Sequence, residues 1–207
     1  MKIEQLCDPD LILYDELVKE SAEGTIFHTS WWRNLVDDIW GKNFTTDIYG
    51  AFEDNKLIAA IPISNRKVLG FKIVYNSKLT PYSGPVFLCK PGMKPVSQAS
   101  WKKSVNRDFA KILKAYNVCL YYPFSLNHID LQPFIWEGFS VDVIYTYILE
   151  LNDLTEIQQN MDRKRRNEIK GGLKAGYNIN KGKIEDFIYL YQTSMKRQNH
   201  ASISPEL

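Results

Sequence analysis

The sequence predicts an α/β fold of the α+β type, in which helices flank a mixed, mostly antiparallel sheet. Helical and strand-like segments follow one another with an antiparallel run near the middle, an order typical of this architecture. The 207 residues are 44% hydrophobic and 13% aromatic, which suits a packed core. This length fits one large domain, or one domain followed by part of another.

The N-terminal part of the chain predicts one strand and two helices. Residues 1–6 alternate in character and form a candidate strand. Asp8-Pro9-Asp10 then resembles a helix start, and residues 11–22 are amphipathic up to Gly24. Thr29 and Ser30 can cap a second helix that runs to Ile39 and stops at Gly41.

The centre of the chain predicts the antiparallel sheet. Residues 45–52 and 57–64 read as a hairpin around the turn Glu53-Asp54-Asn55. Further strands are expected at residues 68–75 and 85–88. Between them lies Thr80-Pro-Tyr-Ser-Gly-Pro85, a loop whose backbone is restricted by two prolines.

The following segments predict a helix over residues 97–116, a short apolar strand over 118–123 and a short helix over 131–136 that ends at Gly138. Residues 141–151 are rich in Val, Ile and Tyr and form the clearest strand of the chain.

A domain boundary is expected near Asn152. Asn152-Asp153 can cap a basic helix, Ile179 can begin a strand, and residues 184–197 form a last amphipathic helix. Residues 153–207 bury too little to form a core of their own. They either dock on the first domain or begin a second one, and the ending of the chain, which lacks a structural finish, favours truncation.

The basic helix is the most unusual local feature. Leu154, Ile157, Met161, Ile169 and Leu173 recur at helical spacing, and Arg165 falls on the same apolar face. A charge there needs a partner, which can be a structural carboxylate or a ligand. The other cations are either a solvated face, part of an inter-domain salt-bridge helix, or contacts to an anion; they are Arg163, Lys164, Arg166, Lys170 and Lys174.

Composition excludes several classes of protein. The net charge of +2 is too small for a general nucleic-acid binder, and the three cysteines are too few and too scattered for a disulfide framework. The N-terminus lacks an apolar signal core, and no apolar run approaches the roughly 20 residues that span a bilayer. The cysteines and the N-terminus lead us to expect a cytoplasmic protein. Neither a zinc ligand set nor a phosphate loop occurs, so we expect no bound metal.

An ordered set of motifs resembles the Fem-type acyltransferases, which have the GNAT (Gcn5-related N-acetyltransferase) fold. Arg166-Asn-Glu-Ile169, followed by Gly172 and Gly176-Tyr177, is similar to the helix motif of that family. Further similarities lie in Phe27-His-Thr-Ser-Trp31, in Ile58-Ala-Ala-Ile-Pro62, in Tyr82-Ser-Gly-Pro85, and in the segment from Gly138 to Leu151. The resemblance covers most of the chain from about Thr25 onward.

This resemblance implies two fused GNAT-like domains, residues 1–152 and the beginning of a second, incomplete domain at 153–207. It implies transfer of an acyl or aminoacyl group to an amine of a cell-envelope precursor or sugar. The donor would be acyl-CoA or aminoacyl-tRNA. The usual CoA signature, Arg/Gln-x-x-Gly-x-Gly/Ala, is absent, and Asn65-Arg-Lys-Val-Leu-Gly70 is only a distant echo of it.

The candidate binding residues are Arg165, Arg166 and Lys170 for phosphates of a donor, tRNA or lipid-linked acceptor. Trp32 and Tyr82 can line an acceptor groove for an amine-bearing small molecule. Adjacent tryptophans on a helix face different directions, so one of Trp31 and Trp32 is expected in the core. The residues identify neither a catalytic group nor an oligomeric state. The alternative function is a non-catalytic module or remnant that docks on RNA, anionic lipid or a protein partner through the basic helix.

Overall fold

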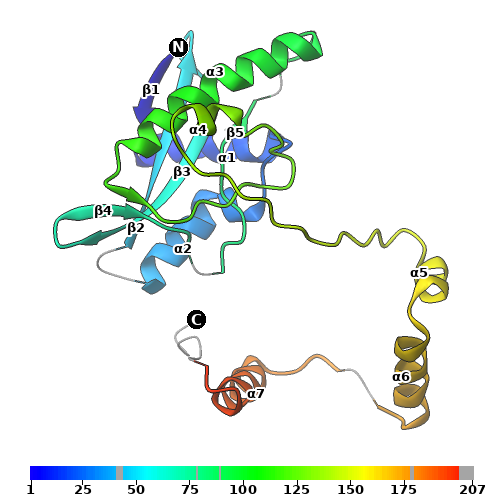
Figure 1. The fold of residues 1–207 in the computed structure, drawn as a ribbon. Helices are drawn as coiled ribbons and strands as arrows, with labels where there is room; N and C mark the ends of the chain where they lie inside the picture. Colours follow the sequence, from blue (N-terminus) through cyan, green and yellow to red (C-terminus); the bar gives the residue numbers. More distant parts are fainter. Residues whose placement is uncertain (41–43, 78, 89, 178–179, 201–207) are drawn as a thin grey trace. The chain divides into compact units, whose positions relative to one another are not determined.

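The computed structural model describes residues 1–40, 44–77, 79–88, 90–177 and 180–200, and it divides the chain into two units, residues 1–142 and 143–207 (Figure 1). The predicted strand at Ile179 and the chain ending after residue 200 lie outside the described residues. The two units are considered separately below.

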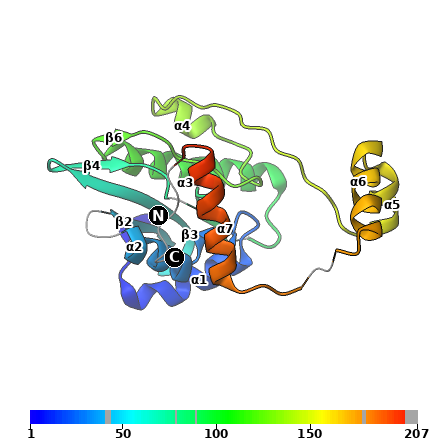
Figure 2. The same cartoon turned by 90° about the horizontal axis from the view of Figure 1, so that it is seen from below.

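One mixed sheet organises the first unit. Its strands follow the order β1-β2-β3-β4-β6, and β5 also pairs with β3. The pairings between these strands are antiparallel except for the parallel pair formed by β4 and β6, which lie side by side (Figure 2). Ser83 and Phe124 form an isolated parallel bridge. The strands are β1 (Lys2–Gln5), β2 (Phe44–Glu53), β3 (Lys56–Val68), β4 (Phe71–Val74), β5 (Val86–Phe87) and β6 (Val118–Cys119).

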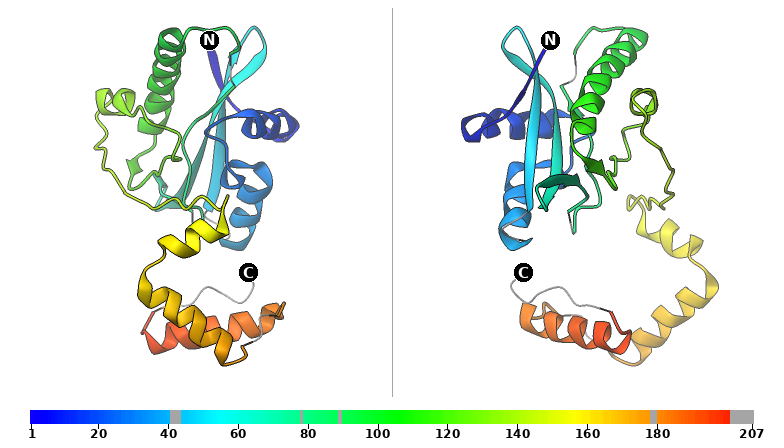
Figure 3. Two further views of the ribbon diagram at one scale, coloured as in Figure 1. Left: turned by 90° about the vertical axis from the view of Figure 1, so that its right-hand side faces the viewer. Right: turned by 60° about the vertical axis from the view of Figure 1, so that its left-hand side comes forward.

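Helices cover both faces of this sheet (Figure 3). α1 (Leu11–Glu20) and α2 (Ser30–Trp40) lie on one face, while α3 (Pro95–Lys114) and α4 (Gln132–Trp136) lie on the other. Because β3 is covered on both faces, its residues from Leu57 to Asn65 are buried without a break. The predicted mostly antiparallel sheet flanked by helices is therefore confirmed.

The hairpin between β2 and β3 turns as the sequence predicts. Asp54 and Asn55 have φ values of 49° and 60°. Two consecutive residues with positive φ match the right-handed twist of the flanking strands, and Asn and Asp tolerate this conformation. The turn and a one-residue register shift between Ala51 and Phe52 together place Thr46 opposite Ser64.

The partner of β3 on its other edge is interrupted. β4 pairs with Asn65–Val68, the Tyr75 N–H still donates to the carbonyl of Ser64, and β5 pairs with Ala59 and Ala60, so the described residues between Tyr75 and β5 lie off this edge. At this interruption a side chain takes the place of a strand, because the Tyr122 hydroxyl donates a hydrogen bond to the carbonyl oxygen of Pro62 at 2.7 Å. The excursion contains the Gly-Pro loop that the sequence singles out.

One strand prediction is wrong. Residues 141–151 form neither a helix nor a strand, and Tyr145 and Tyr147 are 91% and 103% exposed. The composition of the segment does favour a strand, but a strand also needs a neighbour, and no described strand pairs with it. Local β propensity alone does not create a ladder.

The second unit consists of this segment and three helices, α5 (Leu154–Asn160), α6 (Arg163–Lys174) and α7 (Ile184–Arg197). The prediction of one continuous basic helix is wrong, because Met161 is extended and each helix has its own cap. Asp153 accepts hydrogen bonds from the backbone of Thr155 and Glu156, and Asp162 accepts one from Lys164. None of the three helices buries a residue.

Among the described residues, no helix combines the length and the apolar character that a membrane span requires. α7 begins and ends at the predicted residues, and the stacked rings of Phe187 and Tyr191 mark its apolar side.

Candidate functional site

Helix α2 and the loop at residues 79–85 come together around three aromatic rings. The Phe27 ring lies 5.2 Å from that of Trp32 and 6.1 Å from that of Tyr82, measured between centroids. The Trp32 indole N–H donates to the Thr80 hydroxyl at 3.0 Å. The structure therefore brings together Trp32 and Tyr82, the two residues proposed to line an acceptor groove.

The two adjacent tryptophans face different surroundings, as expected. Trp32 is half-buried under the loop, whereas Trp31 is 59% exposed. Trp31 borders a shallow hollow of about 570 Å³ between α1 and the segment before α2. The other residues lining this hollow are Asp15, Val18, Lys19, Gly24, Thr25, Ile26 and Thr29.

His28 fixes the backbone of the loop. Its Nδ1 accepts the backbone N–H of Thr25 at 3.2 Å, so Nε2 carries the proton and donates to the carbonyl of Ser83 at 3.0 Å. The ring is fully buried, and this burial, together with the nearby charge of Arg33, lowers the pKa of His28 to about 4. The imidazole is thus neutral at physiological pH.

Arg33 fixes the same loop through side chains. Its Nη1 donates to the Ser64 hydroxyl at 3.0 Å and its Nη2 to the Ser83 hydroxyl at 2.9 Å. Nη2 also approaches the carbonyl of Tyr82 at 3.5 Å. Burial lowers the pKa of Arg33 from its ordinary value. α2, β3 and the loop are therefore joined by one buried guanidinium.

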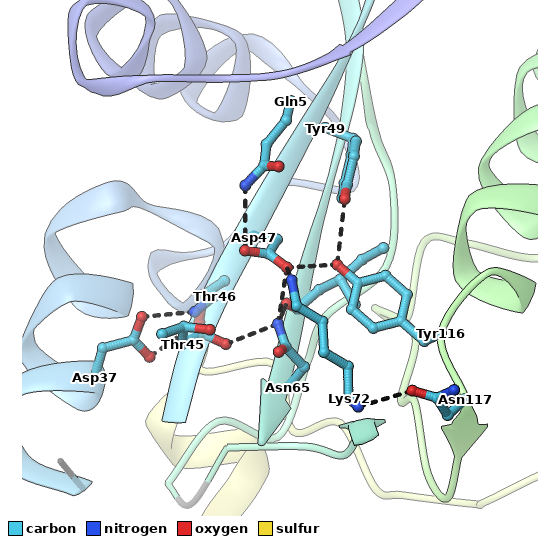
Figure 4. A network of polar contacts seen from close by, with 11 residues as sticks. Gln5, Asp37, Thr45, Thr46, Asp47, Tyr49, Asn65, Lys72, Tyr116 and Asn117 are labelled. Carbon is cyan, nitrogen blue, oxygen red and sulfur yellow. Dashed lines mark hydrogen bonds and ion pairs between the residues drawn. The ribbon is translucent and has the colours of Figure 1, made fainter. Parts of the chain in front are cut away.

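A second polar cluster lies on the α3 face of the sheet (Figure 4). The Asp47 carboxylate accepts hydrogen bonds from Tyr116, Asn65 and Lys72 on Oδ2 and from Gln5 on Oδ1, at distances of 2.7, 3.0, 3.0 and 3.2 Å. The pKa of Tyr116 is raised by burial and by its bonds to Tyr49 and Asp47. The cluster ties four strands to the end of α3.

The part of the chain that the structure describes offers no group of His, Cys, Asp and Glu residues that could hold a metal. The echo of a CoA signature, Asn65 to Gly70, lies on the end of β3 and its turn, as expected. A pyrophosphate site of the usual kind needs a helix N-terminus there. The residues present do not fit that kind of site.

The three predicted basic site residues lie on α6. Arg165 pairs with the Glu168 carboxylate at 2.8 Å on the exposed surface, and Arg166 donates to the carbonyl of Gln159 at 2.8 Å. Lys170 is exposed. Because the apolar stripe is divided between α5 and α6, Arg165 does not lie on one continuous face with Leu154 and Ile157, and its partner is a carboxylate of its own helix.

Sequence reasoning missed His28, Arg33 and Asp47. One signal was available for Arg33, which lies three residues before the buried Val36 and so shares the inward side of α2. Asp47 similarly interrupts an alternating strand on the side of Tyr49 and Ala51. Charges in such positions indicate buried polar clusters, but only the fold shows their partners.

Replacing Trp32 with phenylalanine will lower the free energy of unfolding by about 1–2 kcal/mol, because the ring contact to Phe27 is kept but the indole hydrogen bond to Thr80 is lost. Urea denaturation followed by circular dichroism measures this loss. The matched variant Trp31→Phe alters an exposed ring and should stay within about 0.5 kcal/mol. Equal losses in both variants would contradict the structural role of the hydrogen bond.

Solved structures of other proteins share features of this fold. No protein-family model matches the sequence, and no curated protein matches it. The structure of FemX matches with a TM-score of 0.52 and 13% identity, over 99% of this chain and 52% of the FemX chain. This chain therefore spans about half the length of FemX.

Two acetyltransferases also match, each over nearly its whole length. The aminoglycoside antibiotic 6'-N-acetyltransferase AAC(6')-IG from Acinetobacter haemolyticus has a TM-score of 0.35 and 16% identity, over 74% of this chain and 100% of its own. The ribosomal-protein-alanine N-acetyltransferase from Brucella melitensis biovar Abortus 2308 has a TM-score of 0.39 and 12% identity, over 72% of this chain and 98% of its own.

Proposed function

Because the chain has a Fem-like GNAT fold, we propose that it is an N-acyltransferase or the acceptor-binding part of one. It would move an acyl or aminoacyl group from acyl-CoA or aminoacyl-tRNA to an amine of a cell-envelope precursor or sugar. The observation that carries this proposal is the convergence of Trp32, Tyr82 and the buried Arg33 and His28 at one loop, in a chain that aligns with FemX over 99% of its length.

The acceptor would bind against the aromatic rings. Trp32 and Tyr82 present large ring surfaces that are held in place by Thr80 and Phe27, so little side-chain entropy is lost on binding. Acyl transfer requires a neutral amine placed against the donor carbonyl, and fixed geometry supplies much of the rate enhancement. In this proposal His28 and Arg33 are positioning residues, and no residue is assigned a catalytic role.

The donor would contact α6. Arg163, Arg166, Lys170 and Lys174 follow one another at intervals of three and four residues, so they share one side of the helix. We assign Arg166 and Lys170 to donor phosphates. Arg165 can join them only by exchanging its ion pair with Glu168, which is exposed and therefore weak.

Residues 153–207 would begin a second GNAT-like domain. The match covers 52% of the FemX chain, so nearly half of FemX lies outside it, and the helices of the second unit bury no residue of their own. Co-expression with a polypeptide that supplies the remaining half would then protect α7 from proteolysis. Unchanged cleavage would count against this assignment.

A thermal-shift titration with acetyl-CoA and with aminoacyl-tRNA tests the donor. Saturation at about 100 times Kd adds about 2.7 kcal/mol of stability to the folded protein. A saturable rise with acetyl-CoA indicates a CoA donor, and a rise with aminoacyl-tRNA alone indicates the aminoacyl branch. A rise with neither contradicts donor binding by this chain.

Charge reversal in Arg166→Glu will weaken the binding of aminoacyl-tRNA and reduce the slope of log K against log salt by about one, because one phosphate contact is lost. Fluorescence anisotropy at several salt concentrations measures both quantities. The control Lys56→Glu makes the same charge change at an exposed position of β3. Equal effects in the two variants would indicate a general charge effect and remove Arg166 from the contact.

The second candidate is a non-catalytic binding module, favoured by the exposed basic side of α6. It predicts steep salt dependence with RNA of any sequence and no preference for an aminoacylated end. Equal affinity for charged and uncharged tRNA, without acyl transfer, would support this module over the enzyme.

A further inference from the structure

The charge of Arg33 lies in the interior of the first unit. Its residue is 1% exposed, and it is among the largest fully buried side chains of the described chain. Moving a guanidinium out of water is costly unless a counter-charge or a complete set of acceptors replaces the water. The surroundings of Arg33 therefore have to explain its burial.

The described acceptors of Arg33 are all neutral. They are the hydroxyls of Ser64 and Ser83 and the carbonyl of Tyr82. No ion pair joins Arg33 to a carboxylate of the described residues; Asp37, one turn further along α2, accepts the backbone N–H and the hydroxyl of Thr46 instead. Asp37 makes no direct hydrogen bond with Arg33; its charge acts on Arg33 electrostatically, and the Thr46 and Ser64 hydroxyls, which lie 3.1 Å apart, link the two side chains.

One edge of the guanidinium is poorly satisfied. Nε is buried without a described hydrogen-bond partner, and Nη2 reaches the Tyr82 carbonyl only at 3.5 Å. The N–H groups of Nε and Nη2 point in parallel from the same edge of a guanidinium, and this edge is the fork that a carboxylate or phosphate takes with two oxygens. The weak edge of Arg33 is therefore the edge suited to an oxyanion.

We infer that the Nε–Nη2 edge of Arg33 is a subsite for an oxyanion, a phosphate or a carboxylate, that enters when residues 79–85 move aside. Two of the three acceptors of Arg33, Tyr82 and Ser83, belong to this segment, so the same movement frees the edge and opens the path. The segment also holds Leu79 at a φ of 55°, an unfavourable conformation for a leucine.

The exchange is chemically balanced. The entering oxyanion places one charged oxygen on Nε, which has no described partner, and one on Nη2 in place of the distant Tyr82 carbonyl, and it neutralises the buried cation. Its binding site would adjoin Trp32, the preceding residue of α2, so an acceptor with an acidic group next to its reactive amine would contact both the ring and the oxyanion subsite. This assignment to the acceptor rests on the proposed function, whereas the binding of an oxyanion does not.

The test is an NMR titration of the whole chain that follows the Hε–Nε signal of Arg33. Inorganic phosphate is the first probe and acetate is the second, each matched in ionic strength with sodium chloride. We expect a saturable shift with at least one probe, and the probe that saturates at the lower concentration identifies a phosphate or a carboxylate subsite. Absence of a saturable shift with both probes, or the same shift at the exposed Arg107, would overturn the inference.

Two variants sharpen this test. Ser83→Ala removes a competing acceptor while keeping Arg33, so the oxyanion should bind about five-fold more tightly; unchanged or weaker binding would contradict the exchange. Arg33→Lys loses the fork and should lose the thermal stabilisation by the saturating probe, whereas Arg107→Lys should keep it. If Arg33→Lys does not fold, the wild-type and Ser83→Ala titrations still decide. If the chain binds the oxyanion but transfers no acyl group, the subsite is supported and the proposed acyltransferase function is not.

Discussion

Replacing Asp47 with alanine will lower the free energy of unfolding by about 3 kcal/mol, because four hydrogen-bond donors lose one common acceptor. The Asp47 side chain is 12% exposed, so water does not readily take its place. The Asn65 amide and the Tyr116 hydroxyl are inside the fold, and an unsatisfied group there costs its full desolvation energy. Urea denaturation followed by tryptophan fluorescence measures the loss.

Two controls separate the network from a simple loss of charge. Asp108→Ala removes a carboxylate that pairs with Lys111 on the exposed side of α3, and Lys72→Ala removes the most exposed donor of the network. Both should cost no more than about 1 kcal/mol. If Lys72→Ala is as damaging as Asp47→Ala, the ion pair, rather than the buried acceptor, holds these elements together.

Acidification from pH 6.5 to pH 4 will destabilise the first unit by about 3 kcal/mol for each of its two buried histidines. Burial lowers the pKa of both His28 and His128 to about 4. Between the two pH values the unfolded chain binds protons that the folded chain excludes, so stability is full above about pH 6.5 and falls as the pH approaches 4. Below pH 4 these two groups add no further loss.

Burial is the main cause of the lowered pKa at both rings, whereas the charges facing His28 and His128 act differently. Arg33 lowers the pKa of His28, and Lys102 lowers that of His128 against the opposite effects of Glu23 and Asp130. The experiment measures unfolding free energy at several pH values for the wild type and for His28→Gln and His128→Asn. Each variant should remove about half of the histidine-dependent slope. An NMR titration that places both pKa values near 6.5 would refute the explanation.

The sequence was sufficient to predict elements that depend on nearby residues or on a regular apolar pattern. The hairpin from Phe44 to Val68 carries its own turn at Asp54 and Asn55, and α7 carries a complete apolar side, so both were predictable. The strand predicted at residues 141–151 was wrong because a strand forms only where a second segment pairs with it. The prediction of one continuous basic helix was wrong at Met161, because Asp162, the next residue, caps a new helix despite the helical periodicity of the apolar residues.

The candidate site was only partly predictable for a similar reason. Aromatic residues at Trp32 and Tyr82 are visible in the sequence, and the structure brings both rings against that of Phe27. The groups that hold them come from α2, β3 and the interrupted strand, and they meet through contacts between residues as far apart as Arg33 and Ser83. Periodicity records which side of an element is buried, but it does not record which charge will find which hydroxyl.

The interruption between β4 and β5 gives the protein a segment that can be exchanged. Both ends of residues 75–85 are anchored by strands on the same edge of β3, so a longer or shorter insert changes the loop without changing the sheet register. Ser83 and Gly84 have to be kept. Ser83 accepts hydrogen bonds from Arg33 on its hydroxyl and from His28 on its carbonyl, and Gly84 has a φ of 98°. Thr80 has to be kept as well, because its hydroxyl holds the Trp32 indole, so other sequences can be grafted only between Tyr75 and Thr80.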